Sequence, residues 1–177
     1  AACLIVGMQL KAQQEAQYTQ NQFNSMLMIN PAYAGANPGG SIGLRYRKQW
    51  ASLPGGPKTS NLIAEKLMKN NSLGLGLTVT NDNIGITNHT ALDVNIAYHI
   101  NLSQNTKLSV GTKLGAEFHK SNFNKLVGVD LSDPLYSQSS FVTPYAGTGL
   151  LVYNPKWYAG LTVPKLISFN TRSTTGQ

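Results

Sequence analysis

The chain has 177 residues, a net charge of +7, 41% hydrophobic residues and only 12% charged residues. The charged fraction is about half the ~25% that is usual for soluble domains, and the regular alternation of apolar residues argues against disorder. The basic residues form no stripe of the kind that nucleic-acid binding needs, since the densest group is only Arg45, Arg47 and Lys48.

Residues 1–14 resemble the tail of a secretory signal peptide, with a short apolar run followed by polar residues. We expect cleavage between Ala12 and Gln14. The run is too short for a transmembrane helix, which needs ~20 apolar residues. Cys3 is the only cysteine, so no internal disulfide can form. An alternative interpretation makes Cys3 a lipid-modified residue.

Residues 15–40 form an N-terminal segment that precedes the first predicted strand. The sequence allows a short helix over residues 22–29. Pro31 limits that helix, because proline disfavours the helical conformation at Asn30. The run from Asn37 to Gly40 is a turn signal.

From Ser41 onward the hydrophobic pattern has a period of two, which predicts β-strands. Strands are expected over residues 41–50, 59–68, 72–80, 92–102, 108–119, 145–152 and 157–163. Loops or turns are expected between them, with Asn81 to Gly85 as one loop and residues 120–140 as the longest.

Alternating segments of about ten residues, joined by tight turns and longer loops, are typical of a transmembrane β-barrel. Lipid offers no hydrogen-bond partners, so spanning strands must pair with one another. The rows Leu73 to Val79 and Leu92 to Leu102 are expected to face lipid. The opposite face is polar and is expected to face the lumen, with Asp93, Asn95, His99, Asn101, Lys113, Glu117 and His119. Aromatic residues near strand ends are expected to form an interfacial girdle, namely Tyr46, Trp50, Tyr98, Tyr145, Tyr153, Trp157 and Tyr158.

A soluble β-sandwich would show the same alternation, with its apolar face in a core. Soluble strands are usually ~5–6 residues long, however, and those predicted here are nearly twice that. The predicted fold class is therefore all-β, an antiparallel outer-membrane type β-barrel. Glycines that alternate with leucines are expected to face the lumen, where they leave room for an inserted segment.

The chemistry-bearing residues predict no catalytic, cofactor or metal site. His99 and His119 lie on polar faces of neighbouring strands and could approach each other, with Asp93 or Glu117 as a third metal ligand. We predict lumen-facing polar side chains instead. Asp93 and Glu117 have no motif that supports an acid–base pair, and Asp82 lacks the spacing of a calcium loop.

Several motifs in order resemble the start of the PorP/SprF family. They are Gln17 to Gln20, Asn30 to Gly35, Tyr46 to Trp50, Gly56 to Thr59, Leu73 to Leu77, Asn81 to Gly85, Tyr98 to Ile100 and Tyr158 to Pro164. Members are outer-membrane proteins associated with the type IX secretion system of Bacteroidetes. The resemblance implies a cell outer-membrane location and a role in secretion or surface attachment of cargo with a C-terminal sorting domain.

The implied partners are outer-membrane lipid, other type IX components and a secreted or adhesin-like cargo protein, with no nucleic acid and no small-molecule substrate identified. An outer-membrane porin or solute-binding barrel is the alternative function. Because family members are usually longer, residues 41–177 are expected to be the N-terminal part of an incomplete barrel. The residues predicted to bind a partner or to plug the barrel are Asn30, Pro31, Ala32, Tyr33, Gly35, Arg47 and Trp50. The alternative for Asn30 to Gly35 is a structural turn in which Gly35 adopts a conformation that other residues resist.

Overall fold

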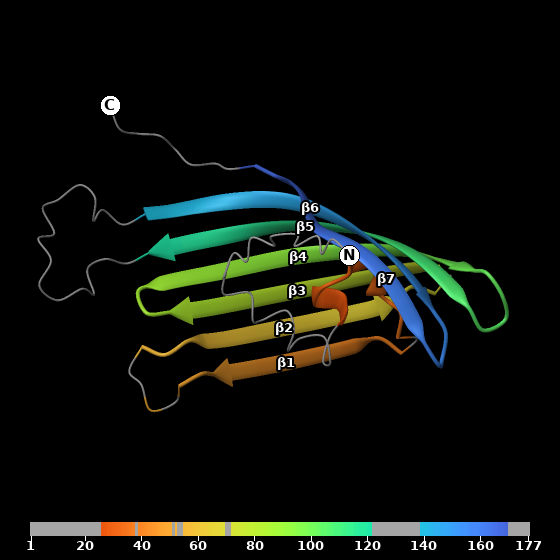
Figure 1. The fold of residues 1–177 in the computed structure, drawn as a ribbon, viewed down its shortest axis with the longest axis horizontal. Coiled ribbons are helices and arrows are strands. Elements are labelled where there is room, and N and C mark those ends of the chain that lie inside the picture. The colour runs from red at the N-terminus through yellow and green to blue at the C-terminus, as the bar shows by residue number, and fades with distance from the viewer. Residues whose placement is uncertain are drawn as a thin grey trace, which may run out of the picture.

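The computed structural model describes residues 26–37, 39–50, 52, 55–69, 72–121 and 139–169. Seven strands form one antiparallel sheet in the order β1 to β7, which confirms the predicted all-β class (Figure 1). The strands are β1 Ser41–Lys48, β2 Lys58–Leu67, β3 Leu73–Ile84, β4 Thr87–Asn101, β5 Lys107–Ser121, β6 Ser139–Tyr153 and β7 Tyr158–Ser168. Two short 3-10 helices precede them, η1 Met26–Met28 and η2 Pro31–Tyr33.

Each strand pairs with the next in the chain, and β1 and β7 form the two edges of an open sheet. The strands β4, β5 and β6 each have 15 residues. A tilted transmembrane strand needs ~9–11 residues, so these strands are long enough to span a bilayer. No helix in the described part of the chain is long and apolar enough to cross a membrane.

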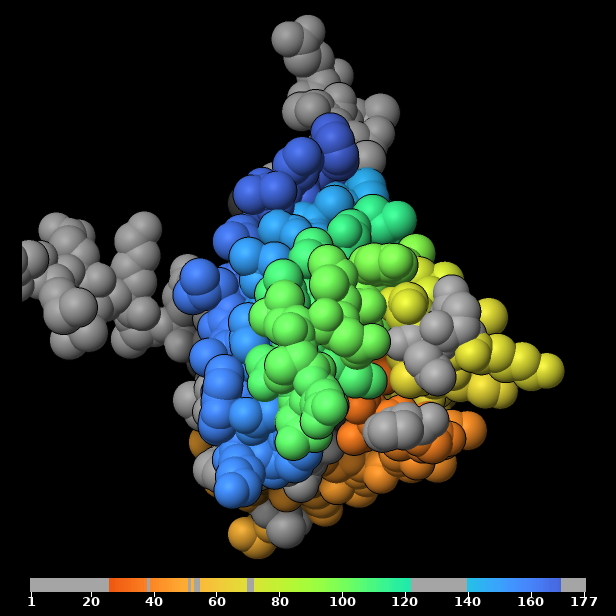
Figure 2. All heavy atoms as spheres, turned by 90° about the vertical axis from the view of Figure 1, so that its right-hand side faces the viewer, coloured from red at the N-terminus to blue at the C-terminus, as the bar shows by residue number. Residues whose placement is uncertain are grey.

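The two ends of the sheet differ in their connections. Short connections join β2 to β3, β4 to β5 and β6 to β7 at one end. Figure 2 looks onto this end, where the green β4–β5 turn and the blue β6–β7 turn are seen. The opposite end carries the β1–β2 and β5–β6 connections and the short β3–β4 turn at Gly85. The predicted loop over residues 120–140 lies mostly outside the described residues, as do residues 1–25 with Cys3.

The prediction of a loop from Asn81 to Gly85 is wrong, because β3 continues to Ile84. Its polar side chains are held within the ladder, where Asn81 Nδ2 donates to Thr90 Oγ1 over 2.7 Å. Polar strand ends of this kind look like loops in sequence. The turn itself needs only Gly85, at a φ of +59°, and the residue that follows it.

The two faces of the sheet have the polarity that the alternation predicts. Outward-facing apolar side chains are exposed, including Leu75, Leu77, Leu92, Val94, Ile96, Ile100, Val110, Leu114, Phe118 and Leu150. The inner face carries buried polar groups, including Asp93, Asn95, His99, Ser109, Lys113 and Glu117. This is the reverse of a water-soluble protein, in which charged side chains are seldom fully buried.

Two aromatic residues of the predicted girdle lie inside instead. Tyr145 is buried, and its hydroxyl donates to Asp93 Oδ1. The Tyr153 hydroxyl is 3.2 Å from His99 Nδ1. The Tyr145 ring occupies space that Gly115 on β5 leaves open, since a Cβ at Gly115 would lie 2.6 Å from Tyr145 Cζ. The other five stay exposed, namely Tyr46, Trp50, Tyr98, Trp157 and Tyr158.

Candidate functional site

The segment from Met26 to Asn37 lies against the inner face of the sheet. Helix η2 contacts β4, β5 and β6, and η1 contacts β3. The hydroxyl of Thr162 on β7 donates to the carbonyl oxygen of Ile29 over 3.2 Å. Contacts that run from β3 to β7 onto one short segment place this segment within the concavity of the sheet, in front of the strands in Figure 1.

Glycines on the inner face make this close approach feasible. A Cβ atom at Gly74 would lie 1.9 Å from the carbonyl oxygen of Ala34, and one at Gly111 would lie 2.2 Å from the backbone nitrogen of Ala32. A Cβ at Gly149 would lie 2.1 Å from Asn30 Oδ1. The prediction that inward glycines leave room for an inserted segment is therefore confirmed, and the inserted segment comes from the chain itself.

Asn30 fixes the start of η2 and ties it to the sheet. Its side-chain Oδ1 accepts a hydrogen bond from the backbone nitrogen of Ala32 over 2.9 Å, which is the arrangement of a helix N-cap. Its Nδ2 donates to the carbonyl oxygen of Leu150 on β6 over 3.0 Å. Pro31 follows at the first position of η2, where its fixed φ suits the helix and no backbone donor is needed. Asn30 is 4% exposed, and both its amide oxygen and its amide nitrogen are hydrogen-bonded.

The carbonyl groups of η2 and its C-cap are bound by side chains from β4 and β5. The Ser109 hydroxyl donates to Ala32 O over 2.6 Å. His99 Nε2 lies 2.8 Å from Ala34 O. A carbonyl can only accept, so Nε2 carries the proton, and Nδ1 is left to accept from Tyr153. These buried bonds satisfy backbone groups that a short helix leaves unpaired.

Gly35 and Glu65 close the segment at the β2 side of the sheet. Gly35 has a φ of +73°, and a Cβ there would lie 2.7 Å from Gly74 Cα. The Glu65 carboxylate is buried and accepts from Gly35 N, Asn37 Nδ2 and Ser41 Oγ. Burial raises the pKa of the Tyr33 hydroxyl, and the nearby Glu65 carboxylate adds to the effect. Tyr33 therefore remains neutral at physiological pH.

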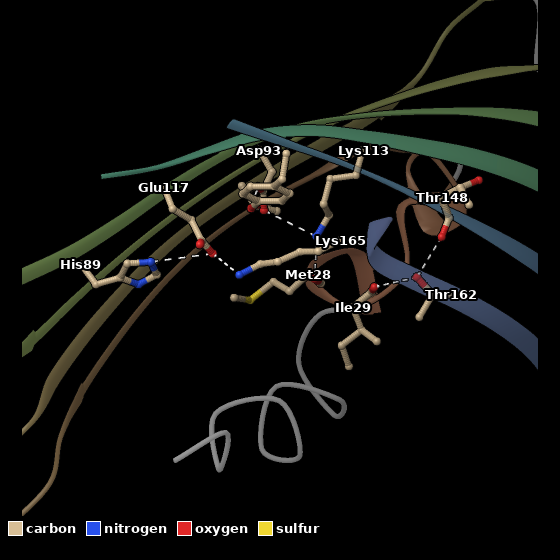
Figure 3. Close-up of polar contacts among 11 residues, drawn as sticks. Met28, Ile29, His89, Asp93, Lys113, Glu117, Thr148, Thr162 and Lys165 are labelled. Atoms are coloured by element: carbon tan, nitrogen blue, oxygen red, sulfur yellow. Dashed lines mark hydrogen bonds and ion pairs between the residues drawn. The ribbon is translucent and has the colours of Figure 1, made fainter. Parts of the chain in front are cut away.

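A polar cluster lies beside η1 (Figure 3). Lys113 Nζ donates to the Met28 carbonyl over 2.9 Å and lies 3.5 Å from Asp93 Oδ2. Asp93 also accepts from the hydroxyls of Thr78 and Tyr145. The side chain of Lys113 is only 4% exposed, so its charge depends on these partners rather than on water. A small cavity of about 80 Å³ remains between Met28 and this cluster.

The structure separates the predicted site residues into two groups. Asn30, Pro31, Ala32, Tyr33 and Gly35 lie together in the docked segment. Arg47 and Trp50 lie toward the far end of β1, away from Ser41, which is the residue of β1 that contacts Glu65. Six residues of strand separate Ser41 from Arg47, which is about 20 Å. Trp50 is 66% exposed and has a φ of +48°.

The suggested approach of His99 to His119 is wrong. His99 pairs with Ser109 in the β4–β5 register, whereas His119 pairs with His89. Ten residues of β4 separate His89 from His99, or about 30 Å. The histidine beside His119 and Glu117 is therefore His89, which the strand spacing alone did not identify because the register depends on the turn between the two strands.

The model of a family described as type IX secretion system membrane protein PorP/SprF matches residues 10–177. The chain belongs to this family. Its members are membrane components of a secretion system rather than enzymes, and the outward apolar face of this PorP/SprF protein agrees with a membrane location. No curated protein matches the chain. No solved structure matches it either.

The residues that hold the segment in this PorP/SprF protein were not all identifiable from sequence. Glu65, Ser109 and Lys113 lie on polar rows of predicted strands, with nothing local to mark them as ligands of a distant backbone. Their inward orientation was predictable from alternation. The only further signal was the run of glycines beside them, which indicated that something approaches the inner face.

Proposed function

We propose that this protein is an outer-membrane component of the type IX secretion system that supports the secretion or surface attachment of cargo proteins with a C-terminal sorting domain. The observation that carries the proposal is the docked segment on the polar inner face of a sheet whose outer face is apolar, in a chain of this family. Ile96 is 42% exposed on the outer face while Asn95 beside it is fully buried.

The outer face needs lipid for a simple physical reason. Exposed apolar surface costs ~25 cal/mol per Å² in water, and this face carries rows of large apolar side chains on every strand from β3 to β6. In a bilayer this cost is absent. An outer-membrane barrel is the architecture that uses β-strands in this way.

The docked segment favours a structural or partner-binding role over free solute passage. A porin keeps a water-filled lumen, whereas here hydrogen bonds from β4, β5 and β7 hold the docked segment against the inner face of the sheet. We further propose that Asn30 to Gly35 act as a plug. The exposed Trp50, near Arg47 at the end of β1, is the proposed contact for a partner protein.

The test uses the full-length protein in its source organism. Deletion of the gene is expected to retain cargo proteins that carry a C-terminal sorting domain inside the cell, and complementation is expected to restore their release. The complementing protein should fractionate with the outer membrane and need detergent for extraction. Normal cargo release after deletion, or recovery as a soluble periplasmic protein, would contradict the proposal.

A porin role is separated by conductance measurements in planar bilayers. The proposed plug predicts a closed protein, and loss of the Lys113 and His99 contacts predicts more frequent openings. A large, steady conductance of the unmodified protein would favour the porin alternative.

A further inference from the structure

Two histidines and a glutamate meet at the end of β4 and β5, outside the docked segment. His89 and His119 are direct cross-strand partners, and their ring centroids are 4.3 Å apart. Glu117 is two residues before His119, so both side chains lie on the inner face of β5. His89 Nε2 lies 3.7 Å from Glu117 Oε1, and His119 Nε2 lies 3.7 Å from Glu117 Oε2.

We propose that His89, Glu117 and His119 form a binding site for a divalent transition-metal ion of the zinc class. One ligand atom from each residue lies within 4.8 Å of the others. Zinc binds imidazole nitrogen and carboxylate oxygen at ~2.0–2.2 Å, so two tetrahedral ligands are separated by about 3.3–3.5 Å. Small side-chain movements would bring the three groups to this spacing.

The hydrogen bonding, exposure and packing of the two histidines support a metal ion bound between the three side chains. His89 Nε2 is buried and has no hydrogen-bond partner among the described residues. Both imidazoles are 29% exposed, which leaves a route for an ion from solvent. Phe141 stacks on His119 with centroids 4.5 Å apart and an interplanar angle of 14°. This stacking holds the His119 ring in place, which lowers the entropy lost when an ion binds.

Lys165 is the group that competes with the ion. Its Nζ lies 2.6 Å from Glu117 Oε1, between β7 and β5, as Figure 3 shows. An ammonium at this position neutralises Glu117 when no metal is present and repels a bound dication. The second oxygen of Glu117, Oε2, faces His119. The carboxylate can therefore bind Lys165 through Oε1 and a metal ion through Oε2. The Lys165 side chain is 44% exposed and can move away.

Three protein ligands would leave a fourth position open to water or to a group from another molecule. His89 and His119 lie near the end of the sheet that carries the longer connections. In outer-membrane barrels this end faces the cell exterior. The orientation rests on the proposed function, whereas the metal site itself does not.

The test is zinc titration of the purified full-length protein in detergent after treatment with a chelator. One zinc ion per chain is expected, with no competing binding of Mg²⁺, because imidazole ligands do not suit that ion. X-ray absorption of the zinc-loaded protein is expected to show two imidazoles in the first coordination shell. This spectrum reports on the unmodified protein and needs no variant to fold.

Variants then assign the ligands. His89→Gln and His119→Gln are each expected to weaken zinc binding by at least about 100-fold, which is the upper end of the effect of outer-shell partners. Lys165→Met is expected to tighten binding by about tenfold, an effect that a merely structural role would not produce. His99→Gln is the matched control, since His99 is the remaining histidine of the chain and lies outside the cluster.

Absence of zinc binding at 100-fold molar excess would overturn the proposal. Binding that survives His89→Gln and His119→Gln, or a spectrum without two imidazoles, would overturn it as well. Loss of cargo release in cells bears on the secretion role and leaves the metal result unaffected.

Discussion

Gly74 and Ala34 are in direct backbone contact. A Cβ at Gly74 would lie 1.9 Å from the Ala34 carbonyl oxygen, which already accepts a hydrogen bond from His99. A side chain at position 74 and the docked segment therefore cannot occupy this space together. The same relationship holds between Gly111 and Ala32, so the glycines of the sheet and the Asn30 to Gly35 run form one structural unit.

Replacement of Gly111 by alanine is expected to displace the segment. The added methyl group would lie 2.2 Å from Ala32 N, and overpacking of this kind costs about 1–3 kcal/mol. We expect faster proteolysis at residues 30–36 and a lower free energy of unfolding in urea. Gly43→Ala is the matched control, because no atom lies within 4 Å of a Cβ there. Equal effects of the two substitutions would contradict the docking geometry.

Substitution of Asn30 separates its two hydrogen bonds. Asn30→Asp keeps the oxygen that accepts from Ala32 but removes the donor to Leu150 O, whereas Asn30→Ala removes both. Loss of an N-cap costs about 0.5–2 kcal/mol, so Asn30→Ala is expected to be destabilising by this amount. Asn30→Asp is expected to be more destabilising still, because it places a carboxylate oxygen against the Leu150 carbonyl in a buried site. Urea unfolding of the two variants measures this difference, and Asn30→Ala as the less stable variant would contradict the buried contact with Leu150.

The lipid face predicts a depth-dependent response to charge. Ile96 lies near the middle of β4, and arginine at the bilayer midplane costs about 2–4 kcal/mol, falling to ~0–1 kcal/mol near the interface. Ile96→Arg should therefore lower the stability in lipid vesicles. Leu102→Arg, in the turn after β4, should have little effect. On a soluble protein, arginine at both exposed positions would be tolerated equally.

The sequence was sufficient for the strands, their faces and the space on the inner face, because these follow from local alternation and from glycine. It was insufficient for contacts that depend on register between strands. His119 meets His89 rather than His99 because the β4–β5 turn fixes which residues are opposite each other. Tyr145 follows the same alternation as its neighbours, yet at the start of the strand predicted over residues 145–152 it resembled a girdle residue. Because β6 begins at Ser139, Tyr145 lies well within the strand, and its hydroxyl binds the buried Asp93.

The separation of Trp50 from the docked segment has a similar origin. Both motifs are close in sequence, and β1 carries the chain about 20 Å away between them. Only the direction of a strand, which composition does not encode, shows that one motif lies inside the sheet and the other at its end.

The account depends most on the claim that the outer face of β4 contacts lipid. Spin labels at Val94 and Ile96, placed one at a time in a chain with Cys3 replaced by serine, measure this directly in vesicles. Gln104 in the β4–β5 turn is the water-exposed reference. We predict that the labels at 94 and 96 are accessible to oxygen and protected from a polar nickel complex, with the reverse at 104. Equal access of the nickel complex to all three positions would contradict the account.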